Sequence, residues 1–371
     1  MDFAKSDIQT MLLDSAERLL SGDAHVEYWR EQFQAPLGFD EARWAQFAEL
    51  GWLALPVPEA AGGLDGTIED LALINVALGK ALAKEPYVST AVIADHVLKN
   101  AADPARGLDL LGGIADGSQR FALAWQDSAK AGGSTTSARK TDQGYVLSGA
   151  KLMALDAPSA QHLIVSARID GYEGLGLFLV PADATGLSSE SYPLIDGTRA
   201  ADLSLAETRL PADAVLVGPN RGADVLQEAI DRGSIALMAQ AVGAMEAANA
   251  ICGTYVKERK QFGTAIGSFQ AIQHLMADNF VAAHQARSML YYAIANADGP
   301  TAGRAAALSA ARIVIGEAGQ TVSRNGIQVH GGYGLTDEYA IGHYFRRLMC
   351  LEKQFGDIAS HIERFGSSLF D

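Results

Sequence analysis

The chain has 371 residues, of which 49% are hydrophobic and 20% are charged, and its formal net charge at pH 7 is −15. This length and composition exclude a disordered chain and are typical of a globular protein with a large core. The acidic balance argues against a nucleic-acid-binding protein, because such a surface needs clustered Lys and Arg.

The cysteine content and the N-terminal region indicate where the protein works. Two cysteines, Cys252 and Cys350, are too few for a disulfide framework and favour a reducing compartment. Residues 1–20 show an amphipathic helical pattern rather than a secretory signal. No uninterrupted apolar run reaches the ~18 residues that a bilayer-spanning helix needs. We therefore expect a cytoplasmic protein with no membrane span.

Residues 1–118 form the first predicted domain, which is helical. Apolar residues recur at intervals of three and four in segments 41–50 and 69–83, and turns with Pro and Gly separate the segments. From residue 119 to 220 the pattern changes to short β-like runs bounded by Gly, Asp and Pro. These runs are residues 121–124, 145–148, 162–165, 175–180 and 201–205. A small sheet domain is therefore expected in the middle of the chain.

The last predicted domain, residues 221–371, is again helical. Its four long periodic segments are rich in Ala and Gly, which allow helices to pack closely. They are residues 222–260, 268–297, 303–325 and 338–365. We expect them to form a four-helix bundle, so that the whole chain is α+β and mainly α.

Two short clusters in this region carry residues suited to a cofactor. Residues 328–334 read Gln-Val-His-Gly-Gly-Tyr-Gly, and such glycines let backbone amides approach an anionic or planar ligand. A helix that begins just beyond them would add its positive end. Residues 259–263 read Arg-Lys-Gln-Phe-Gly, in which Arg259 can pair with a diphosphate and Phe262 can pack on a flat ring. Alone, each cluster has an ordinary explanation as a turn or a basic helix end.

Together with their flanks, the two clusters resemble the acyl-CoA dehydrogenase family. The resemblance continues through Phe-Gln-Ala-Ile-Gln at 269–273 and through Thr336, Glu338 and Tyr339. Near the N-terminus, Leu-Gly-Trp at 50–52 and Val-Pro-Glu at 57–59 are also similar to that family. The similarity covers nearly the whole chain, and the order of helical, sheet and helical regions matches the family's architecture.

The resemblance implies an FAD-dependent enzyme. Members of the family remove the α-hydrogen of an acyl-CoA thioester as a proton and its β-hydrogen as a hydride, and they bind FAD between two subunits. The diphosphate and adenine end of the cofactor would contact nine residues, which are Arg259, Gln261, Phe262, Gln270, Gln328, Val329, His330, Gly331 and Gly332. The flavin ring would lie mainly in a neighbouring subunit. An electron-transfer flavoprotein or a similar acceptor is also implied.

The general base of the family is absent from its usual positions. Removal of the α-proton needs a Glu in a desolvated pocket. The two positions at which family members carry this Glu correspond here to Phe355 and Gly233. No catalytic residue is therefore assigned.

The sheet region also lacks residues that the family uses for catalysis, in this case those that bind the flavin. Gly133, Ser134 and Thr135 replace a Gly-Ser-Asp that binds the flavin edge, while Met153 and Leu155 replace a packing Trp and a hydrogen-bonding Thr. The chain thus resembles the subunit without the catalytic Glu in two-plus-two acyl-CoA dehydrogenases, which act on bulky substrates such as steroid side-chain thioesters. Its partner would be a homologous subunit that bears the Glu.

Two alternatives stay open from the sequence. One is a self-sufficient homo-oligomer with a displaced base, either Asp231, Asp357 or Glu352, which a continuing helix would turn ~60° from Phe355. The ordinary explanation for these carboxylates is a solvated or capping role. The other alternative is a flavin-free scaffold. We interpret His330 as a packing or backbone-orienting residue, and the spacing of the His residues predicts no metal site.

Overall fold

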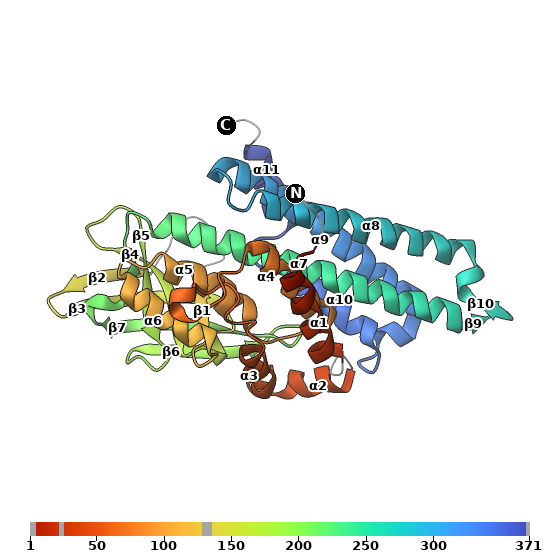
Figure 1. Ribbon diagram of the computed structural model, residues 1–371, viewed down its shortest axis with the longest axis horizontal. Coiled ribbons are helices and arrows are strands. Elements are labelled where there is room, and N and C mark those ends of the chain that lie inside the picture. Colours follow the sequence, from red (N-terminus) through yellow and green to blue (C-terminus); the bar gives the residue numbers. More distant parts are fainter. Residues whose placement is uncertain (1–4, 22–25, 128–135, 369–371) are drawn as a thin grey trace. The chain divides into compact units, whose positions relative to one another are not determined.

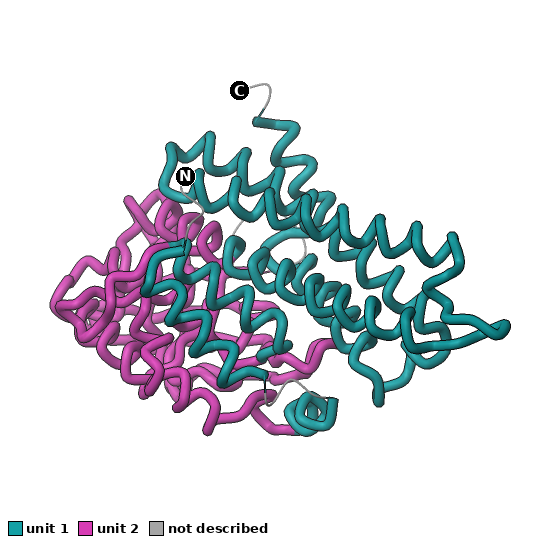
Figure 2. The backbone as a smooth tube through the Cα atoms, turned by 45° about the vertical axis from the view of Figure 1, so that its right-hand side comes forward, with its two compact units in different colours: residues 1–34, 68–83, 234–371 teal, residues 35–67, 84–233 magenta. Residues whose placement is uncertain are grey.

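The computed structural model describes residues 5–21, 26–127 and 136–368 (Figure 1). The chain divides into two compact units (Figure 2). Unit 1 takes residues 1–34, 68–83 and 234–371, and unit 2 takes residues 35–67 and 84–233. Helix α7 (Gly222–Glu258) contributes residues to both units.

An eight-stranded sheet forms the core of unit 2. Its strand order is β6-β7-β3-β2-β4-β5-β8, with β1 paired to β4. Strands β1 and β2 run parallel to β4, and the other neighbours are antiparallel. The strands are β1 (Phe121–Ala124), β2 (Ser137–Thr141), β3 (Gly144–Leu155), β4 (His162–Ile169), β5 (Leu175–Pro181), β6 (Leu187–Pro193), β7 (Arg199–Leu210) and β8 (Val215–Val217). Besides the start of α7 and short 3₁₀ turns, this unit has α3 (Glu41–Glu49), the π-helix η2 (Val88–Ala94), α5 (Asp95–Lys99) and α6 (Pro104–Ala115).

The five predicted β-like runs each lie within a strand, so the expected sheet is confirmed. Three strands of this sheet were missed, namely β2, β6 and β8. Strands β2 and β6 are largely polar, and β6 is mostly exposed while β2 buries a single residue, so neither has the apolar run that marks a half-buried strand. Strand β8 has only three residues, too few to show a period.

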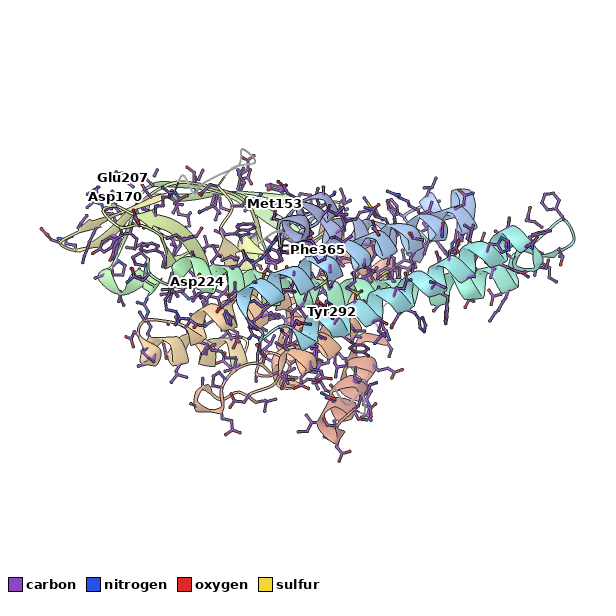
Figure 3. All side chains as sticks on the ribbon, turned by 90° about the horizontal axis from the view of Figure 1, so that it is seen from above. Met153, Asp170, Glu207, Asp224, Tyr292 and Phe365 are labelled. Carbon is purple, nitrogen blue, oxygen red and sulfur yellow. The ribbon has the colours of Figure 1, made fainter. Side chains whose placement is uncertain are left out.

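Met153 occupies an irregularity in this sheet. The register between β3 and β7 shifts between Lys151 and Ala154, and Met153 has a φ of +49° there. Its backbone N–H donates to Asp202 Oδ1 at 2.8 Å, and 37% of the residue is exposed (Figure 3). The bulge thus turns an apolar side chain toward solvent.

Unit 1 is built from helices. They are α1 (Asp7–Ser21), α2 (Val26–Gln34), α4 (Ile68–Lys80), the later part of α7, α8 (Gln270–Ala295), α9 (Thr301–His330), α10 (Ala340–Lys353) and α11 (Ile358–Ser367). Helix α9 packs against α8, α10 and α11, and a hairpin of β9 (Lys260–Gln261) and β10 (Thr264–Ala265) projects beyond the ends of α7 and α8 (Figure 1). The helical C-terminal region predicted from the sequence is confirmed.

The last predicted helix is interrupted. We expected one helix over residues 338–365, but the chain leaves the helical path between α10 and α11. Phe355 has a φ of +59° and Gly356 a φ of +104°, and a right-handed helix cannot continue through such values. The expectation that Glu352 and Phe355 lie on one continuing helix is therefore wrong.

Helices α4 and α7 cross closely enough to require glycine on both. A Cβ on Gly79 would lie 2.0 Å from the carbonyl oxygen of Gln240, and a Cβ on Gly243 would lie 2.0 Å from that of Val76. Helix α7 is also the one described helix that is long and apolar enough to cross a membrane. Because 72% of its most apolar window is buried inside the protein, it has the surroundings of a core helix.

Candidate cofactor site

Phe262 lies at the tip of the β9–β10 hairpin, and 94% of it is exposed. Phe262 and Gly263 have φ values of +50° and +80°, as the two-residue turn of such a hairpin requires. The ring centroid of Phe262 is 6.2 Å from that of Phe269, in an edge-on arrangement. A ring exposed to this degree is open to a planar ligand or to another chain.

Arg259 directly follows α7 and is exposed. Its backbone is fixed on both sides, because its N–H donates to Tyr255 O at 2.9 Å and its carbonyl accepts from Ile266 N at 2.8 Å. Among the described residues its guanidinium has no ion pair or hydrogen bond, and the same is true of the side chain of Gln270 at the start of α8. A cation with open donors on a fixed stretch of backbone suits an anionic ligand.

An apolar cluster joins the two motif regions. Val256 of α7, Ile266 after the hairpin and Val329 of α9 are buried together, with Tyr255 and residues of early α8 packed around them. The structure therefore brings the basic cluster and the glycine segment to one end of unit 1. Val329 itself packs in this cluster and is buried.

The glycine segment differs in detail from the prediction. Gln328 to His330 are the last residues of α9, and Gly331 ends that helix with a φ of +61°. Gly332 and Gly334 do not have a positive φ. The expected helix just beyond the glycines is a 3₁₀ turn, η6 (Gly331–Leu335), and α10 begins only at Ala340.

His330 is buried beside this segment with one nitrogen unsatisfied. Its Nδ1 lies 2.8 Å from Gly326 O and must donate to that carbonyl, which leaves Nε2 as an acceptor. Nε2 is buried and has no hydrogen-bond partner in the described part of the chain. Burial lowers the pKa of His330, so the ring stays neutral at pH 7. The ring lies 4.1 Å from that of Tyr255 and 4.9 Å from that of Tyr339.

These observations fit the adenosine diphosphate part of FAD. Arg259 offers charge for a diphosphate, Phe262 offers a face for a planar ring, and the buried Nε2 of His330 can accept a hydrogen bond from a ligand hydroxyl or amino group. Tyr255 was not among the predicted site residues, although it lies one helical turn before Arg259. In the described residues, no group of three His, Cys, Asp or Glu could hold a metal ion.

Neither position expected for a base holds a proton acceptor. Phe355 is half-buried in the turn between α10 and α11, and Gly233 is buried within α7. Asp231 is also buried in α7, and its Oδ1 accepts a hydrogen bond of 2.8 Å from the amide of Gln227.

The two other carboxylates named as displaced bases act as helix caps. Glu352 Oε1 accepts from Ile358 N at 2.9 Å, and Asp357 Oδ1 accepts from the N–H and hydroxyl of Ser360 at 2.9 and 2.7 Å. The hydrogen bonds from Ser360 lower the pKa of Asp357 to about 2. A base for a thioester needs a pKa shifted in the opposite direction.

The sheet contributes a buried ion pair that the sequence did not reveal. Lys151 Nζ lies 2.6 Å from Asp127 Oδ1 and donates to Ser166 Oγ at 3.0 Å, and both charged side chains are buried. This pair fixes β3 to the segment after β1. Leu155 is half-buried at the end of β3, whereas Gly133, Ser134 and Thr135 lie outside the described residues.

Three family models match consecutive parts of the chain. The acyl-CoA dehydrogenase N-terminal, middle and C-terminal domains match residues 6–118, 126–208 and 220–369. The chain belongs to the acyl-CoA dehydrogenase family.

The similarity of this chain to individual relatives extends over nearly its full length. A probable acyl-CoA dehydrogenase of Bacillus subtilis, YngJ, is 29% identical over 96% of this chain and 95% of its own. A variant of the Tcur3481-Tcur3483 steroid ACAD is 30% identical, with a TM-score of 0.89 and 98% of each chain covered. The ChsE4-ChsE5 complex of Mycobacterium tuberculosis shares the fold, with 24% identity and a TM-score of 0.92 over 100% of this chain and 99% of that one.

Proposed function

We propose that this acyl-CoA dehydrogenase is the subunit that completes the FAD site of a hetero-oligomer, while a homologous subunit supplies the catalytic Glu. One contrast carries the proposal. Phe355 and Gly233 stand where the family's base would be, yet Arg259 and Phe262 keep exposed side chains and His330 keeps a buried, unpaired nitrogen, all suited to a dinucleotide.

The residues proposed to hold the cofactor are Arg259, Gln261, Phe262, Gln270, Gln328, Val329, His330, Gly331 and Gly332. Arg259 would pair with the diphosphate, Phe262 would cover a ring, and His330 would accept a hydrogen bond at Nε2. Bound FAD supplies the acceptor for the hydride that leaves the β-carbon of the acyl-CoA. Because the whole chain is strongly acidic, these local groups must hold the anionic ligand against the overall field.

The proposed substrate is a bulky, steroid-type acyl-CoA. Support comes from the relative described as a steroid ACAD and from the complex of two differently named subunits, both similar over nearly the whole chain. We further propose an electron-transfer flavoprotein or similar acceptor, a cytoplasmic location, and domains at residues 1–118, 119–220 and 221–371.

The alternatives have weaker support. A self-sufficient enzyme would need Asp231, Glu352 or Asp357 as its base, but all three hold hydrogen bonds within the fold. A flavin-free scaffold has no need for an exposed cation, a buried, unsatisfied imidazole and a protruding Phe at the same end of unit 1.

The proposal can be tested by comparing the purified chain alone with the chain co-expressed with a homologous Glu-bearing subunit. We expect stoichiometric flavin absorbance and acyl-CoA turnover only in the co-purified assembly. If the assembly stays colourless with every such partner, the scaffold alternative is correct and the proposal is wrong.

A further inference from the structure

A single buried arginine holds the turn that carries Phe355. Arg312 of α9 is 6% exposed, and its Nη1 donates to Leu351 O at 3.2 Å. Its Nη2 lies 3.1, 2.6 and 2.8 Å from the carbonyl oxygens of Glu352, Gln354 and Gly356. One guanidinium therefore binds four main-chain carbonyls, before and after residue 355.

The conformation fixed in this way is unfavourable for the residue it holds. Phe355 has a φ of +59°, which a bulky side chain rarely adopts and which costs about 1–2 kcal/mol. Glu352 and Asp357 secure the start of α11 on the far side of the turn. A strained residue that its surroundings hold from both sides points to a functional requirement on where its side chain lies.

Arg312 is not placed to bind an anionic ligand. The cavity beside it, which Glu352, Met238 and Leu348 also line, has a volume of about 10 Å³, enough for at most one water molecule. Burial lowers the pKa of Arg312 to about 10, so the group keeps its charge at neutral pH. The charged guanidinium therefore binds carbonyl groups of the protein's own backbone.

We propose that Arg312 is the positioning residue for position 355, and that the turn in this chain still has the geometry to present a base although the base has been lost. The second half of this statement rests on the proposed function, and the first half does not. The same turn presents a phenyl group here and would present a carboxylate equally well, because Arg312 bonds only to the backbone.

The positioning role can be measured without substrate or flavin. Phe355→Trp places a fluorescent reporter in the turn, and amide exchange at Ile358, whose N–H is held by Glu352, reports the same segment. Arg312→Gln should speed exchange at Ile358 by at least about tenfold and make the reporter more accessible to quenchers, while Arg312→Lys should restore part of the protection.

Arg347→Gln is the matched control. Arg347 is also a buried arginine of unit 1, and its Nη2 donates to Gln240 at 2.6 Å, away from the turn. Its loss should lower stability without selectively exposing the turn. If Arg312→Gln leaves the exchange rate and quenching unchanged, or if Arg347→Gln changes them equally, the positioning role is wrong.

The second half of the proposal is tested by Phe355→Glu in the assembly, with the partner's own catalytic Glu replaced by Gln. A 3-thia-acyl-CoA in D₂O has α-hydrogens but no β-hydrogen, so a base can only break the α-C–H bond and return a deuteron. Phe355→Glu should raise deuterium uptake at least about 100-fold over the unsubstituted chain. Adding Arg312→Gln should reduce that gain at least tenfold with the same flavin content.

The outcomes of this second test are distinct. If Phe355→Glu gives no uptake in an assembly with full flavin content, the turn does not present a base and this half is wrong. If the unsubstituted chain already takes up deuterium, it has its own base and the proposed function fails instead. Neither outcome affects the amide-exchange and quenching results, which test only whether Arg312 positions the turn.

Discussion

The ring of His330 lies with its centroid 4.1 Å from the ring of Tyr255. This contact joins the last turn of α9 to the last turn of α7, so that two motifs far apart in the sequence share one end of unit 1. The two segments indicate a cofactor site only when they are considered together, and this contact shows that they lie together in the fold.

Arg259→Gln should weaken FAD retention in the assembled enzyme by about tenfold to a hundredfold, because a charge-assisted hydrogen bond is worth roughly 1.5–3 kcal/mol. Flavin retained through dialysis or size exclusion is the measurement. Lys257→Gln removes the same charge two residues earlier and should have little effect. Equal losses in the two variants would mean that only the general field matters.

Gly79→Ala should lower the free energy of unfolding by about 3 kcal/mol or more, since the new methyl group would overlap the backbone of Gln240. Gly253→Ala is the control in α7, because nothing lies within 4 Å of its added Cβ. That variant should be neutral or more stable by up to about 1 kcal/mol. Urea denaturation of both variants measures the free energy of unfolding. An unchanged value for Gly79→Ala would contradict the close helix crossing.

Glu352→Ala and Asp357→Ala should each cost about 1 kcal/mol of stability, because each carboxylate accepts a hydrogen bond from a backbone N–H at the start of α11. Neither should reduce turnover by the assembly by more than a few-fold. Thermal unfolding and acyl-CoA oxidation measure the two effects. A loss of turnover beyond a hundredfold in either variant, with flavin content intact, would support the alternative in which that carboxylate is the displaced base.

His361 should make stability depend on pH. Burial, with Arg312 and Arg364 nearby, lowers the pKa of His361 to about 4 from 6.5. Between pH 6.5 and 4 the unfolded chain binds a proton at this His, whereas the folded chain does not. The contribution of His361 to the free energy of unfolding therefore falls as pH falls from 6.5 to 4 and is constant above 6.5. His361→Gln should therefore flatten the loss of stability over this range, as measured by urea denaturation at several pH values. Parallel curves for this variant and the unsubstituted chain would contradict this account.

Much of the fold could be read from the sequence, because apolar periodicity survives wherever an element buries one face. The run at residues 175–180 was found because nearly all of strand β5 is apolar and buried, and the polar, exposed Leu187–Pro193 was missed because it has no such run. The break at Phe355 could not be foreseen. Helical periodicity runs on through residues 354–357, and the buried Arg312 that fixes the turn lies in another helix.

The candidate site was predicted as a set of residues and not as a geometry. The motifs identified Arg259, Phe262 and His330, and the structure places them at one end of unit 1. The unsatisfied nitrogen of His330 and its contact with Tyr255 depend on how α7 and α9 pack, which no local pattern records. The expected positive end of a helix next to the glycines was wrong for the same reason, because α9 ends there.

The most direct test of the central claim is an anaerobic titration with a bulky acyl-CoA, followed by flavin absorbance, of the purified chain alone and of its assembly with a Glu-bearing partner. The account predicts stoichiometric flavin reduction in the assembly and none in the chain alone. Reduction of one flavin per chain by the chain alone, free of any homologue, would contradict it.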